Sequence, residues 1–181
     1  VSVSYASGVF ASTSTFKVGY TLSTGNYLDG AVGPVAVWKR VLSNAEIATL
    51  YRGVSWGYSY AQLFYAKPSL TYGITAWWDM TDASGNATAS VGTALTATNT
   101  PTTLPLGVIL PEPFDAYGAR FDGTANRLNL GNPASLNVER TTPQAGLVIL
   151  NTAGSPSSQS VITKIATGVS GWKFTLLNNF P

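Results

Sequence analysis

The chain has 181 residues, of which 45% are hydrophobic and only 10% are charged, and its formal net charge is +2. It contains no Cys and no His, which excludes disulfide scaffolds, thiolate or imidazole metal sites and Ser-His-Asp catalysis. The basic residues form no cluster of the kind that a nucleic-acid groove needs, and no apolar run approaches the roughly 20 residues of a membrane span. We therefore expect neither nucleic acid nor a membrane as a partner.

Most of the chain predicts strands, because apolar residues recur with a period of two between Gly, Pro, Asn and Asp turns. In chain order, the predicted strands lie around residues 16–20, 35–38, 74–80, 147–150, 161–162 and 172–176. Residues 95–113 are rich in Thr and Pro and predict a long loop or an edge segment, since proline cannot donate to a β-ladder. Strands at this spacing, with little helix between them, indicate an all-β sandwich.

The alternation also assigns individual side chains to faces. Val35 and Val37 are expected to face one way, and the residues between and after them, Ala36 and Trp38, to face the other. One shared face is predicted for Ile74, Ala76, Trp78 and Met80. The same reasoning places three tryptophans in the core: Trp38, Trp78 and Trp172.

One short helix is predicted at about residues 44–52. Ser43 fits the N-cap of a capping box, with Glu46 reaching back to it. Gly53 suits the left-handed residue that follows many helix C-termini. The helix carries one apolar stripe at i, i+3 and i+4, formed by Ile47, Leu50 and Tyr51.

Two segments have residue patterns that are informative as a set. In residues 27–51, a strand follows Asp29-Gly30, an aromatic residue precedes Lys39-Arg40, and the capped helix ends in Leu50-Tyr51. In residues 74–123, an aromatic strand containing Trp77-Trp78 is followed by a Gly turn and later by Phe121-Asp122-Gly123. These patterns resemble the closing and opening signatures of the laminin-G-like, concanavalin-A-like jelly-roll superfamily. The resemblance implies a jelly-roll β-sandwich of antiparallel sheets.

The two signatures occur in reverse order along the chain. Residues 1–65 resemble the C-terminal part of a laminin-G-like jelly roll, and residues 66–181 resemble the N-terminal part. The chain is then either the junction between tandem jelly rolls or a circular permutation in which both halves pack as one domain. A third alternative is completion in trans, in which another copy supplies the central hairpin expected after residues 172–174. Because the chain does not begin with Met, we expect a fragment or a processed piece.

The acidic residues do not form the pair that a glycosidase of this fold would use. Such enzymes place two carboxylates on one strand at i, i+2 or i, i+4, with the carboxyl groups about 5 Å apart in retaining enzymes. No predicted strand holds two acids at that spacing. We expect turns, caps and surface positions for all eight acids: Asp29, Glu46, Asp79, Asp82, Glu112, Asp115, Asp122 and Glu139. The sequence therefore predicts a protein that is not an enzyme.

Two candidate binding sites remain. No cofactor is expected, although the resemblance implies Ca²⁺ as an alternative to simple turn chemistry, with loop oxygens of Asp79, Asp82, Asn86 and Asp122 as ligands. Sugar binding would use an aromatic group between the helix and the next strand, formed by Trp56, Tyr58 and Tyr60. The alternative is that these three aromatics seal the helix against the sandwich.

Together these features predict a non-catalytic structural or adhesion module, outside the cell or on a virion surface. A phage fibre, a capsid decoration or a bacterial surface assembly would suit the neutral polar composition. Its partners would be copies of itself, neighbouring structural subunits or cell-surface glycans. One alternative is a carbohydrate-binding module of a secreted enzyme. A second is a fragment of a concanavalin-A-like glycosidase or lyase whose catalytic strand lies elsewhere.

Overall fold

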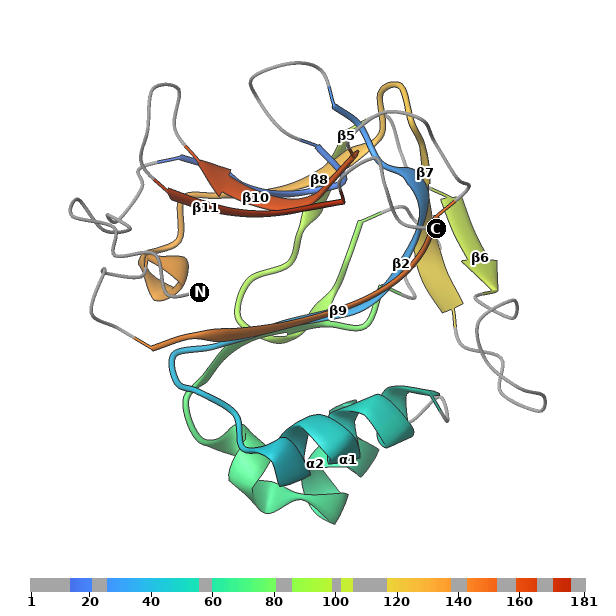
Figure 1. The fold of residues 1–181 in the computed structure, drawn as a ribbon. Coiled ribbons are helices and arrows are strands. Elements are labelled where there is room, and N and C mark those ends of the chain that lie inside the picture. Colours follow the sequence, from blue (N-terminus) through green and yellow to red (C-terminus); the bar gives the residue numbers. More distant parts are fainter. Residues whose placement is uncertain are drawn as a thin grey trace, which may run out of the picture.

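The computed structural model describes residues 14–20, 26–55, 60–80, 86–98, 102–105, 117–137, 143–152, 159–165 and 171–176. Within these residues, the strands form two antiparallel sheets that stack face to face, and helices cover the outer face of one sheet (Figure 1). The predicted antiparallel β-sandwich is confirmed at this level. The helical layer makes the molecule three layers deep instead of the two that were expected.

The first sheet has five strands among the described residues. Their spatial order is β11 (Gly171–Leu176), β10 (Gln159–Ile165), β1 (Phe16–Val18), β8 (Arg127–Gly131) and β5 (Thr96–Thr98). Strand β1 therefore lies in the middle of this sheet, although it comes from the start of the chain. It pairs antiparallel with β10 on one side and with β8 on the other.

The second sheet has six strands among the described residues and is built around the long strand β2 (Asp29–Trp38). One side of β2 pairs with β9 (Ala145–Thr152). The other side pairs with β7 (Tyr117–Asp122) near the start of β2 and with β3 (Ile74–Trp78) near its end. Beyond these strands lie β6 (Thr102–Pro105), which pairs with β7, and β4 (Ala89–Val91), which pairs with β3.

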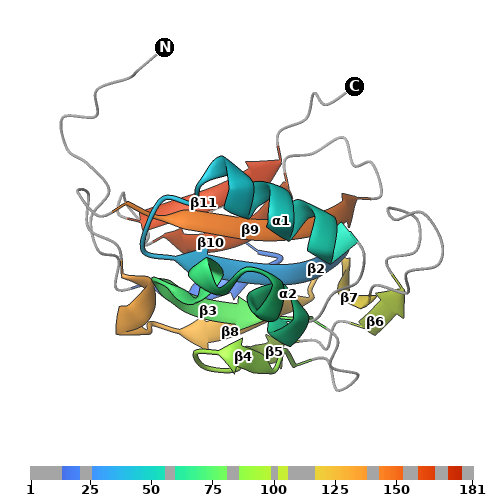
Figure 2. The same cartoon turned by 90° about the horizontal axis from the view of Figure 1, so that it is seen from below.

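Two α-helices lie under the second sheet, α1 (Asn44–Ser55) and α2 (Tyr60–Ala66) (Figure 2). Two short 3-10 helices, η1 (Pro68–Thr71) and η2 (Ala134–Leu136), complete the described elements. Helix α1 begins where the sequence predicted but continues through Gly53 to Ser55, so the expected left-handed stop at Gly53 is wrong. Helix α2 was not predicted.

Strand β2 has both faces buried because a hydrophobic core lies on each side of the second sheet. Val35 and Val37 join Phe16, Trp78 and Phe121 in the core between the sheets. Ala36 and Trp38 join a second core, which lies between this sheet and the helices and also contains Leu50, Leu63, Phe64, Leu70 and Trp77. The predicted opposition of these two pairs is confirmed, and the second core explains why β2 carries no polar side chain after its first residue, Asp29.

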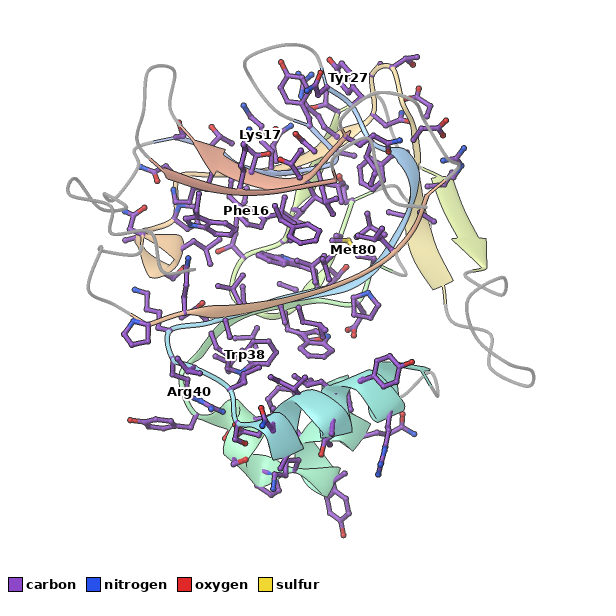
Figure 3. All side chains as sticks on the ribbon, in the orientation of Figure 1. Phe16, Lys17, Tyr27, Trp38, Arg40 and Met80 are labelled. Carbon is purple, nitrogen blue, oxygen red and sulfur yellow. The ribbon has the colours of Figure 1, made fainter. Side chains whose placement is uncertain are left out.

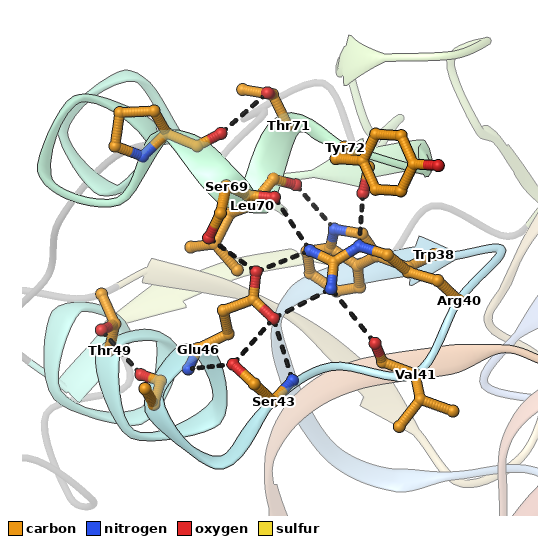
Figure 4. A network of polar contacts seen from close by, with 12 residues as sticks. Trp38, Arg40, Val41, Ser43, Glu46, Thr49, Ser69, Leu70, Thr71 and Tyr72 are labelled. Atoms are coloured by element: carbon orange, nitrogen blue, oxygen red, sulfur yellow. Dashed lines mark hydrogen bonds and ion pairs between the residues drawn. The ribbon is translucent and has the colours of Figure 1, made fainter.

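A buried ion pair holds the helical layer in place (Figure 4). Arg40 donates to both carboxylate oxygens of Glu46 at 2.9 and 2.7 Å, and to the carbonyl oxygens of Ser69 and Tyr72 at 2.9 and 2.6 Å. The backbone N–H of Ser43 donates to Glu46, and Glu46 N donates to the Ser43 hydroxyl, which confirms the capping box. The hydrogen bonds from Arg40 hold the pKa of Glu46 well below its usual range, against the opposing effect of burial.

Three side-chain predictions were wrong for local reasons. Ile47 and Tyr51 are 51% and 70% exposed, because the inward face of α1 runs through Glu46, Leu50 and Gly53. Ile74 packs against the core between the second sheet and the helices, away from Ala76 and Trp78, because a register shift between Val37 and Trp38 interrupts the alternation.

In residues 95–113, β5 and β6 form strands that lie at sheet edges. The edge alternative is therefore the correct one for these two strands.

Candidate functional site

The two margins of the sandwich differ. At one margin the chain passes from β4 in one sheet to β5 in the other, and the buried residues Ala87 and Leu95 pair across this connection. The indole N–H of Trp78 closes it further by donating to the carbonyl oxygen of Thr93 at 2.8 Å. At the opposite margin, β9 and β11 run along the edges of their sheets (Figure 2). We call this second margin the open side.

A groove of about 430 Å³ lies at the open side between the two edge strands. Strand β9 contributes residues 145–148 to its wall, preceded by Gln144. The opposite wall is formed by Ile162 of β10 and by Trp172 and Phe174 of β11. Among the lining residues, Gln144 is the one with a polar side chain other than the indole of Trp172, so the groove is apolar.

The side chain of Trp172, in the wall of this groove, packs against the core but lacks a hydrogen bond among the described residues. Its ring packs against Phe16 with the ring centroids 5.8 Å apart. Its indole Nε1 is buried and has no hydrogen-bond partner among the residues that the structure describes. A buried donor without an acceptor costs on the order of 1–3 kcal/mol. Phe174, two residues further on, remains 45% exposed. The groove thus presents apolar area, much of it from Phe174.

The edge strands beside the groove present backbone groups as well. Among the described residues, β9 pairs with β2 alone and β11 pairs with β10 alone. Strand β9 reads Ala-Gly-Leu-Val-Ile-Leu-Asn-Thr and contains neither a charge nor a proline. Charges and prolines are the usual means by which edge strands avoid pairing with other chains, so β9 is an unprotected template for strand addition.

The predicted sugar-binding aromatics are not placed as a group. Trp56 and Tyr58 lie outside the described residues, and Tyr60 is the first residue of α2. Their role stays a prediction.

The predicted calcium ligands are engaged in hydrogen bonds wherever they are described. Asp79 accepts from the indole N–H of Trp77 at 2.6 Å and from Ser90 at 2.8 Å, and Asn86 accepts from the N–H of Ala97 at 2.8 Å. Asp122 accepts three backbone N–H groups of the following turn, and Asp82 lies outside the described residues. No group of three or more acidic side chains among the described residues could hold a metal ion. The calcium site stays a prediction, because Asp82 lies outside the described residues.

Strand register brings together two carboxylates that sequence spacing could not pair. Asp29 lies directly opposite Asp122 across β2 and β7. Asp29 accepts from Arg120 at 2.7 Å, and Asp122 is held by its turn. Burial raises the pKa of Asp122, but three backbone N–H donors from residues 124–126 outweigh this and hold the pKa well below its usual range. Asp122 therefore lacks the raised pKa of a general acid.

No protein-family model, curated protein or solved structure matches the chain. Among the described residues, no helix is both long enough and apolar enough to cross a membrane. The open side of the sandwich is the feature whose chemistry points most directly to a partner.

Proposed function

We propose that this chain is a non-catalytic structural module of the jelly-roll type that assembles with copies of itself through the open side of its sandwich. An extended segment of a neighbouring copy pairs with the exposed edge of β9 and places apolar side chains in the groove. The low charge and neutral polar composition suit a site of action outside the cell or on a virion surface. The observation that carries this proposal is the apolar groove between two edge strands.

The chemistry of the groove favours a peptide over a neutral glycan. A glycan would need several polar side chains to bind its hydroxyl groups, and Gln144 alone among the lining residues offers a polar side chain of that kind. An extended peptide obtains its hydrogen bonds from the backbone edge and its specificity from pockets for alternate side chains.

The charge distribution favours a second copy as the partner. Strand β9 carries no charge, so two β9 strands meet without the like-charge repulsion that opposes most self-pairing. An antiparallel pair of β9 strands about a two-fold axis would join two six-stranded sheets into one continuous sheet. The net charge of +2 is also too small for strong repulsion between whole molecules.

The carboxylates support the absence of catalysis in this proposal. A glycosidase needs one carboxyl group with a raised pKa beside a second carboxylate. Each of the four described acids already serves a structural partner: Asp29 binds Arg120, Glu46 binds Arg40, Asp79 binds Trp77 and Asp122 binds its turn. None of these contacts leaves a carboxyl group poised for proton transfer.

Self-association should depend on the groove. We expect the wild-type chain to sediment as dimers or larger assemblies at about 100 μM, in the affinity range of modest interfaces. Phe174→Lys places a charge at the groove wall and should return the chain to a monomer of 19.0 kDa. Analytical ultracentrifugation over a hundredfold range of concentration measures both states.

Tyr65→Lys is the matched control, since Tyr65 is 91% exposed and lies on α2, away from the open side. This variant should assemble like the wild type. A wild-type chain that stays monomeric throughout the concentration range would contradict the proposal. Equal loss of assembly in both variants would contradict it too.

A further inference from the structure

A second cluster of unusual chemistry lies on the outer face of the five-stranded sheet. Lys17 and Arg127 both approach the ring of Tyr20, with the Lys17 ammonium 5.3 Å and the Arg127 guanidinium carbon 5.2 Å from its centroid. The ring of Tyr27 packs against Tyr20 with the centroids 4.7 Å apart. We call these four residues the Tyr20 cluster.

Strand alternation fixes the side on which this cluster lies. Phe16 and Val18 point into the core between the sheets, so Lys17 between them points outward (Figure 3). Leu128 lies in the same core, which places its neighbour Arg127 on the outer face as well. Tyr20 and Tyr27 form an isolated bridge just beyond β1, and Thr163 donates to the Tyr20 carbonyl oxygen at 2.8 Å. The cluster is therefore held by backbone and strand contacts.

The cations of the cluster have no acidic partner among the described residues. The five strands of this sheet carry Lys17, Arg127, Lys164 and Lys173 and no Asp or Glu. The two ion pairs of the described residues, Arg40–Glu46 and Arg120–Asp29, lie elsewhere. Lys17 is only 9% exposed, and burial together with the positive charge of Arg127 lowers its pKa. Two cations thus lie close to one tyrosine ring, with no carboxylate paired to either of them in the described part of the chain.

Neutral hydrogen-bonding groups surround these cations. Asn129 lies opposite Lys17 on β8 and donates to Thr98 of β5 at 2.8 Å. Thr163 lies opposite Lys17 on β10. The outer face of the sheet therefore combines two cations with phenol, amide and hydroxyl groups.

We propose that the Tyr20 cluster binds the carboxylate or sulfate group of an acidic sugar. An oxyanion beside Lys17 and Arg127 would supply the missing counter-charge, and the guanidinium of Arg127 can bind such a group in a bidentate manner. The amide of Asn129 and the tyrosine hydroxyls are suited to sugar hydroxyl groups. This site is separate from the open side. A failure of self-association would therefore not refute sugar binding, and a failure of sugar binding would not refute self-association.

Isothermal titration calorimetry at low salt tests the site with six probes. Four are inorganic sulfate, a galacturonic-acid hexasaccharide, a chondroitin sulfate hexasaccharide and neutral cellohexaose, and two are other polyanions, a poly-glutamate peptide and a thymidine hexanucleotide. We expect at least one acidic hexasaccharide to bind at least tenfold more tightly than sulfate, and cellohexaose not to bind. Binding of sulfate alone, or of cellohexaose equally well, overturns the assignment to an acidic sugar. A poly-glutamate peptide or a thymidine hexanucleotide that binds as tightly as the acidic hexasaccharide also overturns it.

Variants locate the binding site. Lys17→Met and Arg127→Gln keep the approximate size of each side chain, and each should weaken binding of the acidic hexasaccharide at least tenfold. Lys39→Met removes an exposed cation outside this sheet and should change the affinity less than twofold. Near-ultraviolet circular dichroism checks that each variant is folded, and Arg127→Lys offers a second folded variant in which binding should weaken less than in Arg127→Gln. Equal weakening by Lys39→Met, or unchanged binding in a folded Lys17→Met or Arg127→Gln variant, refutes the site.

Discussion

Gly19→Ala is expected to destabilise the protein much more than the same replacement at Gly131. Both glycines have positive φ angles, +82° and +75°, so an alanine pays a similar backbone cost of about 1–2 kcal/mol at either position. The positions differ in the space available for a Cβ atom. At Gly19 this atom would overlap the ring of Phe121, whereas at Gly131 it would meet nothing within 4 Å.

Phe121 cannot easily give way, because it is fully buried in the core between the sheets. Overpacking of a tight core adds about 1–3 kcal/mol. We therefore expect Gly19→Ala to lower the free energy of unfolding by about 2–5 kcal/mol, and Gly131→Ala by about 1–2 kcal/mol. Urea denaturation followed by tryptophan fluorescence measures both. Equal losses in the two variants would show that Phe121 does not restrict Gly19.

Arg40→Met should be the most damaging charge change in the described residues. It removes the charged partner of the buried Glu46 in α1 and leaves this carboxylate with hydrogen bonds from Ser43 and Ser69 but without its counter-charge. Breaking a buried pair in this way costs about 3–5 kcal/mol. The hydrogen bonds to the carbonyl oxygens of Ser69 and Tyr72 are lost as well, so α1, η1 and the end of β2 should loosen together.

Arg120→Met is the matched control, because the side chains of Arg120 and Asp29 are 32% and 36% exposed. Loss of such an exposed pair costs about 0–1 kcal/mol. Thermal unfolding at pH 7 compares the two variants directly. Similar shifts in melting temperature would contradict the structural role given to the Arg40–Glu46 pair.

The sequence predicted the strands and the capping box because these depend on local patterns. The period-two alternation of Val35, Ala36, Val37 and Trp38 correctly gave two opposed faces, and Ser43 with Glu46 correctly gave the start of α1. It did not predict the third layer, because an alternating pattern does not say what covers each face. The available signal was the run of β2 after Asp29, which has no polar side chain, since a strand that is apolar on both faces must be covered on both sides.

The candidate site was less predictable than the fold. The groove depends on β9 and β11 lying at the same margin of two different sheets, which is a property of topology and not of spacing. Likewise, Lys17 and Arg127 are separated by more than a hundred residues and meet only because β1 pairs with β8. The uncharged sequence of β9 was readable in advance, but its position at an edge was not.

Hydrogen exchange of backbone amides in dilute and concentrated samples tests the role of the open side most directly. If copies assemble there, the amides of Ala145–Thr152 and Gly171–Leu176 that point away from β2 and β10 should exchange rapidly in the dilute monomer and become protected on assembly. Amides at the closed margin, in Ala89–Val91 and Thr96–Thr98, should exchange at the same rate in both samples. An assembled sample in which β9 and β11 gain no protection would contradict the proposed mode of assembly.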